Sequence, residues 1–351
     1  MNTRLQHIDI AKGIGILLVV FGHNNIKGKL FYIIFSFHLP LFLFLSGLFF
    51  NADGKLKELM WSKFDSIIKP YLTTLIIVYP MFPNNSIINY LAGIIYSTSF
   101  TIPLVWGPLW FLTHLWAVWV FSWLFVRVTK LSSIKRIFQV LLLLLLLLIG
   151  FLIRRVFWQI PIRFGGVTFD LFSQNFLLPG LPLSIDIVFI SGFFFLLGFL
   201  LKQKIFDFKV KYKYLIFSLL LFGFCHYYFQ YTIDLNLRRY DHLIISTLEA
   251  ISGIYMVLCI SSWISRYKVI GEIFAFIGTG SLFILIFHYI FQSTAYNFLT
   301  TYYESNYFTK FCAFIIGSTI PLLIWELVKR NDYLSLLFLP LKSNKLMTKK
   351  K

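Results

Sequence analysis

Two ionisable residues, Lys12 and His23, stand eleven positions apart in an otherwise apolar stretch near the start of the sequence. Eleven residues are close to three turns of an α-helix, so both side chains would lie on one face, roughly 16 Å apart along the axis. Such groups are costly in a membrane helix unless they face protein or a water-filled cavity. An imidazole can act as a base near neutral pH. The alternative is structural: Lys12 pairs with Asp9 and reaches the headgroups, and His23 ends a helix beside Asn24.

Two further ionisable residues lie inside apolar stretches. His38 could approach His23 near the outer side of the membrane and share proton transfer with it. It could equally just hydrogen-bond a backbone carbonyl that Pro40 leaves without a partner. Glu249 is an acid in an apolar environment, which predicts a basic partner or a role in orienting a catalytic histidine or an acceptor.

A polar cluster precedes the apolar stretch that contains Glu249. It could bind sugar hydroxyls or an anionic lipid carrier, or it could be an ordinary solvated loop. Its residues are Arg238, Arg239, Asp241 and His242.

The elements that position these residues are predicted to be membrane helices. Of the 351 residues, 58% are hydrophobic and 13% are charged, and the mean hydropathy is +0.79. These values exclude a soluble domain of this length and predict an all-α integral membrane protein in the cytoplasmic membrane. Ten crossing helices are expected, near residues 8–26, 30–50, 70–82, 108–127, 137–153, 184–201, 213–231, 243–263, 272–297 and 311–328. The shorter stretch from Ile87 to Tyr96 could be re-entrant or interfacial. An eleventh crossing between residues 83 and 107 is the alternative, and it would invert the orientation of every later helix and scatter the charge bias.

The net charge of +18 is explained by membrane topology rather than by nucleic-acid binding, because the basic residues lie in short segments between apolar stretches. Lysine and arginine are more frequent in the loops expected on the cytoplasmic side than in those expected outside. This bias favours a bundle of ten helices with both termini in the cytoplasm. Residues 1–330 would form the membrane domain and 331–351 a short basic tail. The three cysteines, Cys225, Cys259 and Cys312, have no metal-ligand spacing, so no metal site is expected.

Four segments together resemble the membrane acyltransferase-3 family, in the order in which that family carries them. The match looks closest to the branch of fucose-4-O-acetylase-like enzymes that modify surface polysaccharides. The segments are Lys12 and His23 in the first stretch, Phe37-His38-Leu39-Pro40 through Ser46-Gly47, Gly107-Pro108-Leu109-Trp110-Phe111-Leu112, and Gly278-Thr279-Gly280-Ser281-Leu282 followed by His288.

The resemblance implies an acyl-CoA donor, most simply acetyl-CoA, and a polar acceptor outside the cytoplasm. It also implies that Lys12 and His23 are the central pair, with His23 as catalytic base or transient acyl carrier. Ser281 and His288 are supported by their motif alone. His288 could also be a packing or capping residue.

One segment departs from the family pattern. Many members carry Arg-x-x-Arg before the third helix, whereas this chain has Lys63 and Lys69, six residues apart. These lysines could attract the polyanionic donor together with Lys12, or they could simply reflect topology.

The resemblance therefore implies transfer of an acyl group, most simply acetyl, from acyl-CoA across the bilayer to a hydroxyl of a surface polysaccharide or lipid-linked sugar. Two alternatives stay open. The first is a transporter or flippase of a glycan precursor, since buried polar groups in many helices also describe transporters. The second is an acyltransferase that acts on a small cytoplasmic molecule.

Overall fold

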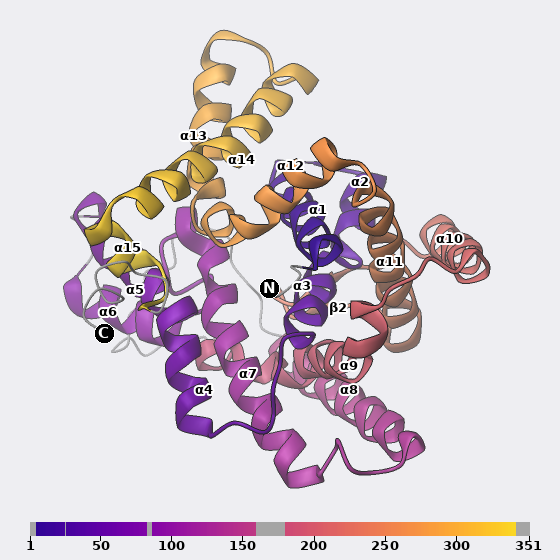
Figure 1. The fold of residues 1–351 in the computed structure, drawn as a ribbon. Helices are drawn as coiled ribbons and strands as arrows, with labels where there is room; N and C mark the ends of the chain where they lie inside the picture. The colour runs from indigo at the N-terminus through magenta and orange to yellow at the C-terminus, as the bar shows by residue number, and fades with distance from the viewer. Residues whose placement is uncertain (1–4, 25, 83–85, 159–179, 342–351) are drawn as a thin grey trace. The chain divides into compact units, whose positions relative to one another are not determined.

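The structure is a computed structural model that describes residues 5–24, 26–82, 86–158 and 180–341. These residues are almost entirely helical, and their one sheet is a pair of two-residue strands (Figure 1). This confirms the predicted all-α class. Of the predicted tail, residues 342–351 lie outside the described part of the chain.

Fifteen α-helices and two strands are defined in the described residues. The helices are α1 Gln6–Gly22, α2 Lys29–Phe35, α3 His38–Gly47, α4 Leu56–Lys63, α5 Lys69–Val78, α6 Ile87–Tyr96, α7 Trp110–Thr129, α8 Arg136–Trp158, α9 Val188–Phe206, α10 Tyr212–Tyr228, α11 Leu243–Ile264, α12 Lys268–Thr279, α13 Ser281–Tyr302, α14 Tyr307–Arg330 and α15 Asp332–Phe338. The strands are β1 Ile233–Asp234 and β2 Arg239–Tyr240, and the short π and 3-10 helices are η1 Phe64–Ile68, η2 Tyr79–Met81, η3 Leu104–Leu109 and η4 Pro182–Ile187.

Seven helical segments of the described chain are long and apolar enough to cross a bilayer. They are Lys29–Gly47, Leu104–Thr129, Arg136–Phe157, Pro182–Phe206, Leu243–Ile264, Ser281–Tyr302 and Tyr307–Arg330. The chain is thus a multi-pass helical membrane protein. Ten crossings with both termini in the cytoplasm stay a prediction, because α1, α5 and α10 are shorter than these seven.

One predicted helix, 272–297, is divided in the structure. Helix α12 ends at Thr279 and α13 begins at Ser281, on either side of Gly280. Hydropathy alone joins the two because apolar residues continue through the break. By contrast, α6 covers the predicted short stretch from Ile87 to Tyr96, and its ten residues span only about 15 Å, half the thickness of the hydrocarbon.

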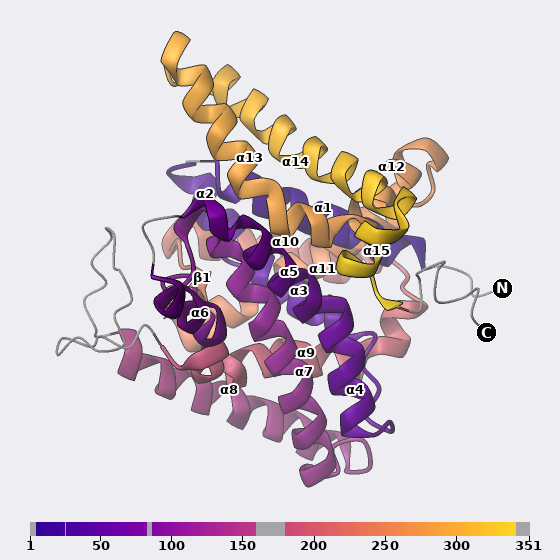
Figure 2. The same cartoon turned by 90° about the vertical axis from the view of Figure 1, so that its left-hand side faces the viewer.

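The chain forms two compact units. The first comprises Met1–Phe50 and Phe193–Leu322, and the second comprises Asn51–Gly192 and Leu323–Lys351. In the first unit, α1 packs against α12, α11, α13 and α3. Figures 1 and 2 both show α13 running beside α14. The residues Ile16, Val19 and Val20 of α1 form a buried cluster with Ile284 of α13, so the helix that carries Lys12 and ends just before His23 lies at the centre of its unit.

Glycines allow α1 and α12 to meet backbone to backbone. A Cβ atom added to Gly278 would lie 1.8 Å from the carbonyl oxygen of Asp9, and one added to Gly13 would lie 2.3 Å from that of Phe274. Real atoms never approach so closely. Gly278, which belongs to the same sequence motif as Ser281, therefore allows α12 to contact α1, the helix that leads to His23.

The second unit is built from α4, η1, α5, α6, α7, α8, η4 and α15. The side chains of Tyr71 and Tyr90 tie α5 to α6, donating to the carbonyls of Ile94 and Leu75 at 2.8 and 2.7 Å. Helix α15 packs against α5, so the start of the predicted tail is part of this unit.

Candidate active site

His23 follows directly after the last residue of α1 and points one ring nitrogen back along the helix. Its Nδ1 lies 2.9 Å from the carbonyl oxygen of Val19. A carbonyl only accepts hydrogen bonds, so Nδ1 must carry the proton in the neutral ring. The lone pair is then on Nε2, which is the arrangement that a general base requires.

Two other histidines make the same bond. His38 Nδ1 donates to the carbonyl of Ile34, and His288 Nδ1 donates to that of Ile284, each at 2.8 Å. Both side chains are buried. His38 thus binds a backbone carbonyl, as one interpretation of the sequence held, but it is not the Ser36 carbonyl that Pro40 would leave without its helical donor.

These three residues, His23, His38 and His288, form what we call the histidine cluster. The rings of His23 and His288 meet edge to face with centroids 5.1 Å apart, and the imidazoles of His23 and His38 interact electrostatically. Nε2 of His288 is buried without a hydrogen-bond partner. The structure therefore brings together three imidazoles from α3, α13 and the end of α1, two of which sequence reasoning paired.

Polar side chains hold the elements around the cluster. Gln292, one turn beyond His288, donates to the carbonyl of Val20 at 3.0 Å and leaves its own buried oxygen without a partner. Asn24 donates to the carbonyl of Lys310 at 2.7 Å. Ser281 is the first residue of α13 and lies seven residues before His288, which places both on one face of that helix.

Lys12 lies on α1, as predicted, in the turn that carries Asp9. Its Nζ is 3.8 Å from Asp9 Oδ1 and 4.6 Å from the centroid of the Phe49 ring. Its side chain is 29% exposed. Lys12 therefore pairs with Asp9, as the structural alternative predicts. Its ammonium group also remains partly exposed.

The lysines expected to help bind the donor belong to the second unit. Lys69 Nζ lies 2.6 Å from both Asp65 Oδ1 and the carbonyl oxygen of Leu339, so it joins α5 to the end of α15. Lys63 Nζ lies over the ring of Trp119, 3.6 Å from its centroid. Lys69 thus has a structural role that the sequence did not reveal.

Glu249 pairs with a base, as its position in an apolar stretch predicted. Its carboxylate meets Nδ1 of His226, which lies on α10 and stacks on Phe222 with centroids 4.6 Å apart. Glu249 is fully buried. The sequence alone does not identify His226 as this partner, because nothing in a single sequence pairs two residues on different helices.

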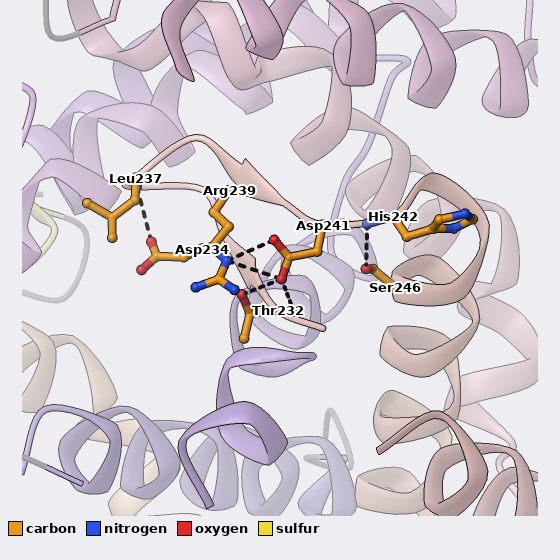
Figure 3. A network of polar contacts seen from close by, with 7 residues as sticks. All are labelled: Thr232, Asp234, Leu237, Arg239, Asp241, His242 and Ser246. Carbon is orange, nitrogen blue, oxygen red and sulfur yellow. Dashed lines mark hydrogen bonds and ion pairs between the residues drawn. The ribbon is translucent and has the colours of Figure 1, made fainter. Parts of the chain in front are cut away.

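A β-hairpin joins α10 to α11 and carries the predicted polar cluster (Figure 3). Arg239 Nε donates to both oxygens of Asp241, at 2.8 and 3.1 Å. Asp241 also accepts hydrogen bonds from the backbone and hydroxyl of Thr232. Arg238 is buried at a residue with φ of 55° and donates to the carbonyl of Asn236. Part of the cluster therefore lies in an ordered hairpin that is held by its own hydrogen bonds.

Comparison with known families decides the class of this chain. The model of the acyltransferase domain family matches residues 5–325, which is nearly the whole chain. The chain belongs to the acyltransferase-3 family. No curated protein and no solved structure matches it.

Membership makes this chain an acyltransferase, and the family match covers every candidate residue described above. Within the described residues of this acyltransferase, no group of three or more His, Cys, Asp or Glu side chains is placed to hold a metal ion. Imidazoles such as those of the histidine cluster can carry out proton transfer or nucleophilic attack.

Proposed function

We propose that this acyltransferase moves an acetyl group from acetyl-CoA across the membrane to a hydroxyl of a surface polysaccharide or lipid-linked sugar. The observation that carries the proposal is the histidine cluster, in which each Nδ1 is bound to a carbonyl of its own chain and each Nε2 keeps its lone pair. Transfer of an acyl group to an alcohol needs such a base at neutral pH.

His23 is the reacting imidazole in this proposal. Its Nε2 takes the proton of the sugar hydroxyl while the oxygen attacks the thioester carbonyl. The carbon–sulfur bond then breaks, and His23 returns the proton to the leaving thiolate, which departs as a thiol. His288, whose ring touches that of His23, and His38 line the site beside the base. A route through an acyl-imidazole on His23 uses the same residues.

Lys12 belongs to the donor side of the site. It lies about three turns from His23 on the same helix, and its ammonium is only partly covered by Asp9 and Phe49. A phosphate of the donor could compete for it with the carboxylate. Within the second unit, Lys63 adds positive charge, and Lys69 joins α5 to the end of α15.

The hairpin belongs to the acceptor side. Strand β1 packs against α3, the helix that begins with His38, and Arg239 interacts electrostatically with Tyr32 on α2. Asp241 fixes the direction of the Arg239 guanidinium, which leaves that group preorganised to donate to sugar oxygens. Arg238 shapes the turn that presents it, and the pair of Glu249 and His226 supports the helices on either side.

Replacement of His23 tests the proposal. We expect His23→Ala to abolish O-acetylation of the surface glycan, measured by NMR of the isolated polysaccharide, with the protein still present in the membrane. His7→Gln is the matched control because His7 lies on the same helix and donates to the carbonyl of Ile205, a bond that glutamine can keep. Full acetylation with His23→Ala would contradict the proposal.

A further inference from the structure

A serine and a histidine of the second unit form a pair that the proposed reaction does not use. His114 lies in the second turn of α7, and Ser191 lies in the first turn of α9. Nε2 of His114 is 2.7 Å from the hydroxyl oxygen of Ser191. Both residues are fully buried. A nucleophilic hydroxyl at this distance from an imidazole is the basic requirement for serine activation.

The other ring nitrogen fixes the direction of proton transfer. His114 Nδ1 lies 3.3 Å from the carbonyl oxygen of Leu183. Because a carbonyl only accepts, Nδ1 carries the proton, and Nε2 must accept the hydrogen of the Ser191 hydroxyl. The pair therefore contains a nucleophile, a base and a group that orients the base.

The carbonyl that orients His114 comes from a strained turn. Leu183 and Ser184 have φ angles of 56° and 53°, a left-handed conformation that is unfavourable for residues other than glycine. The turn is held by Asp186, whose Oδ1 accepts from the backbone of Leu181 at 2.8 Å. Strain of this kind persists only where surrounding contacts enforce it, and it is concentrated at functional sites.

The segment 107–112, which precedes His114, resembles the family but has no role in the proposed reaction. Trp110 precedes His114 by one turn, and its indole lies against the imidazole with centroids 5.5 Å apart. Helix α7 therefore places a large ring over the base, which shields it from water and limits its motion.

We propose that Ser191 is an activated nucleophile that accepts an acyl group from an acyl thioester, with His114 as its base. The hydroxyl oxygen attacks the thioester carbonyl, and its proton passes to His114 Nε2. The carbon–sulfur bond breaks, and His114 returns the proton to the leaving thiolate, so the products are a serine ester and a free thiol. The identity of the acyl donor rests on the proposed function. The activated serine itself does not depend on it.

A fluorophosphonate probe tests the activated serine without acetyl-CoA, because such reagents react with hydroxyls that a neighbouring base activates. We expect the full-length protein in detergent to be labelled at Ser191, located by mass spectrometry of its peptides. Labelling should disappear with Ser191→Ala and fall by about 10²-fold with His114→Asn. It should persist with His23→Ala, which separates this site from the glycan transfer reaction.

Incubation with acetyl-CoA should add an acetyl group to Ser191 of the His23→Ala protein. Ser191→Cys keeps a nucleophile of similar size and should be acetylated in the same position, which controls for loss of folding in Ser191→Ala. Absence of labelling at Ser191 in the unmodified protein, or equal labelling with His114→Asn, would overturn the proposal and leave the pair as a hydrogen bond between two helices. Neither result would affect the prediction for His23.

Discussion

The three imidazoles of the histidine cluster share one feature: each Nδ1 donates a hydrogen bond to a carbonyl of the preceding turn. This bond selects the tautomer with a basic Nε2 without using any second side chain. The same feature recurs at His114, where the carbonyl comes from the strained turn at Leu183. An imidazole held in this way is oriented by the backbone, so its direction depends on where the helix ends or bends and not on a neighbouring carboxylate.

Glu249 and His226 form a buried pair, and we expect the loss of His226 alone to cost more stability than the loss of both partners. His226→Phe leaves a carboxylate without its base inside the protein, which we expect to lower the free energy of unfolding by about 3–5 kcal/mol. Adding Glu249→Gln removes the unpaired charge and should recover most of this loss. Thermal unfolding in detergent measures both. If the double variant were no more stable than His226→Phe, the pair would not be the source of the effect.

At the residue scale, the sequence could predict His23 and His38 as candidates because polar residues in apolar stretches are conspicuous, and it points to His288 only through the resemblance of its motif to the family. It could also predict that Glu249 needs a base. It could not identify His226 as that base, or join His114 to Ser191, which is 77 positions away. Such pairs depend on how the helices rotate and pack, and hydropathy contains no information on either.

At the element scale, the contact of α12 with α1 depends on glycine. Gly278→Ala would place a Cβ atom against the carbonyl of Asp9, and we expect a loss of about 1–3 kcal/mol in stability together with reduced acyl transfer, since α1 carries His23. Gly223→Ala on α10 is the matched control, because a Cβ atom there meets nothing within 4 Å. Equal stability of the two variants, measured by thermal unfolding, would refute the close contact.

The hairpin should lose stability as the pH rises. Burial raises the pKa of Asp234, although hydrogen bonds from the Leu237 and Asn236 backbone and the charges of both arginines lower it. The folded hairpin therefore holds this proton more tightly than the unfolded chain. Stability is greatest below the ordinary pKa of aspartate, about 3.9, and falls as the pH rises from there through the raised pKa.

Asp234→Asn tests this pH dependence because the amide oxygen can still accept the bond from Leu237. We expect the variant to lose less stability than the unmodified protein between about pH 4 and pH 7, at about 1.4 kcal/mol for each unit by which the pKa is raised. Unfolding midpoints across that range provide the measurement. Parallel pH profiles for the two proteins would show that Asp234 does not titrate as proposed.

Most elements could be predicted from apolar stretches, and their errors have a physical cause. The division at Gly280 was missed because α12 and α13 are both apolar, and only the glycine marks the break. The sequence indicates the bounds of the short helix α6 because prolines and asparagines flank it. The two-residue strands β1 and β2 are too short to produce an alternating pattern that a sequence can reveal.

For the whole molecule, the distribution of lysine and arginine predicts which loops face the cytoplasm. We expect a cysteine at Lys209, between α9 and α10, to react only with reagents that enter the cell, and one at Tyr303, after α13, to react from outside. Both side chains are exposed. The background should lack Cys225, Cys259 and Cys312. Reaction of both positions from the same side would contradict the predicted topology.

The central claim is that His23 joins a thioester on one side of the bilayer to an alcohol on the other. Vesicles containing the purified protein, with labelled acetyl-CoA on the cytoplasmic side and the glycan acceptor on the opposite side, test it most directly. Label should appear on the acceptor with the unmodified protein and with His7→Gln, and should be absent with His23→Ala. Transfer of label at an unchanged rate with His23→Ala, or only to acceptors on the donor side, would contradict the claim.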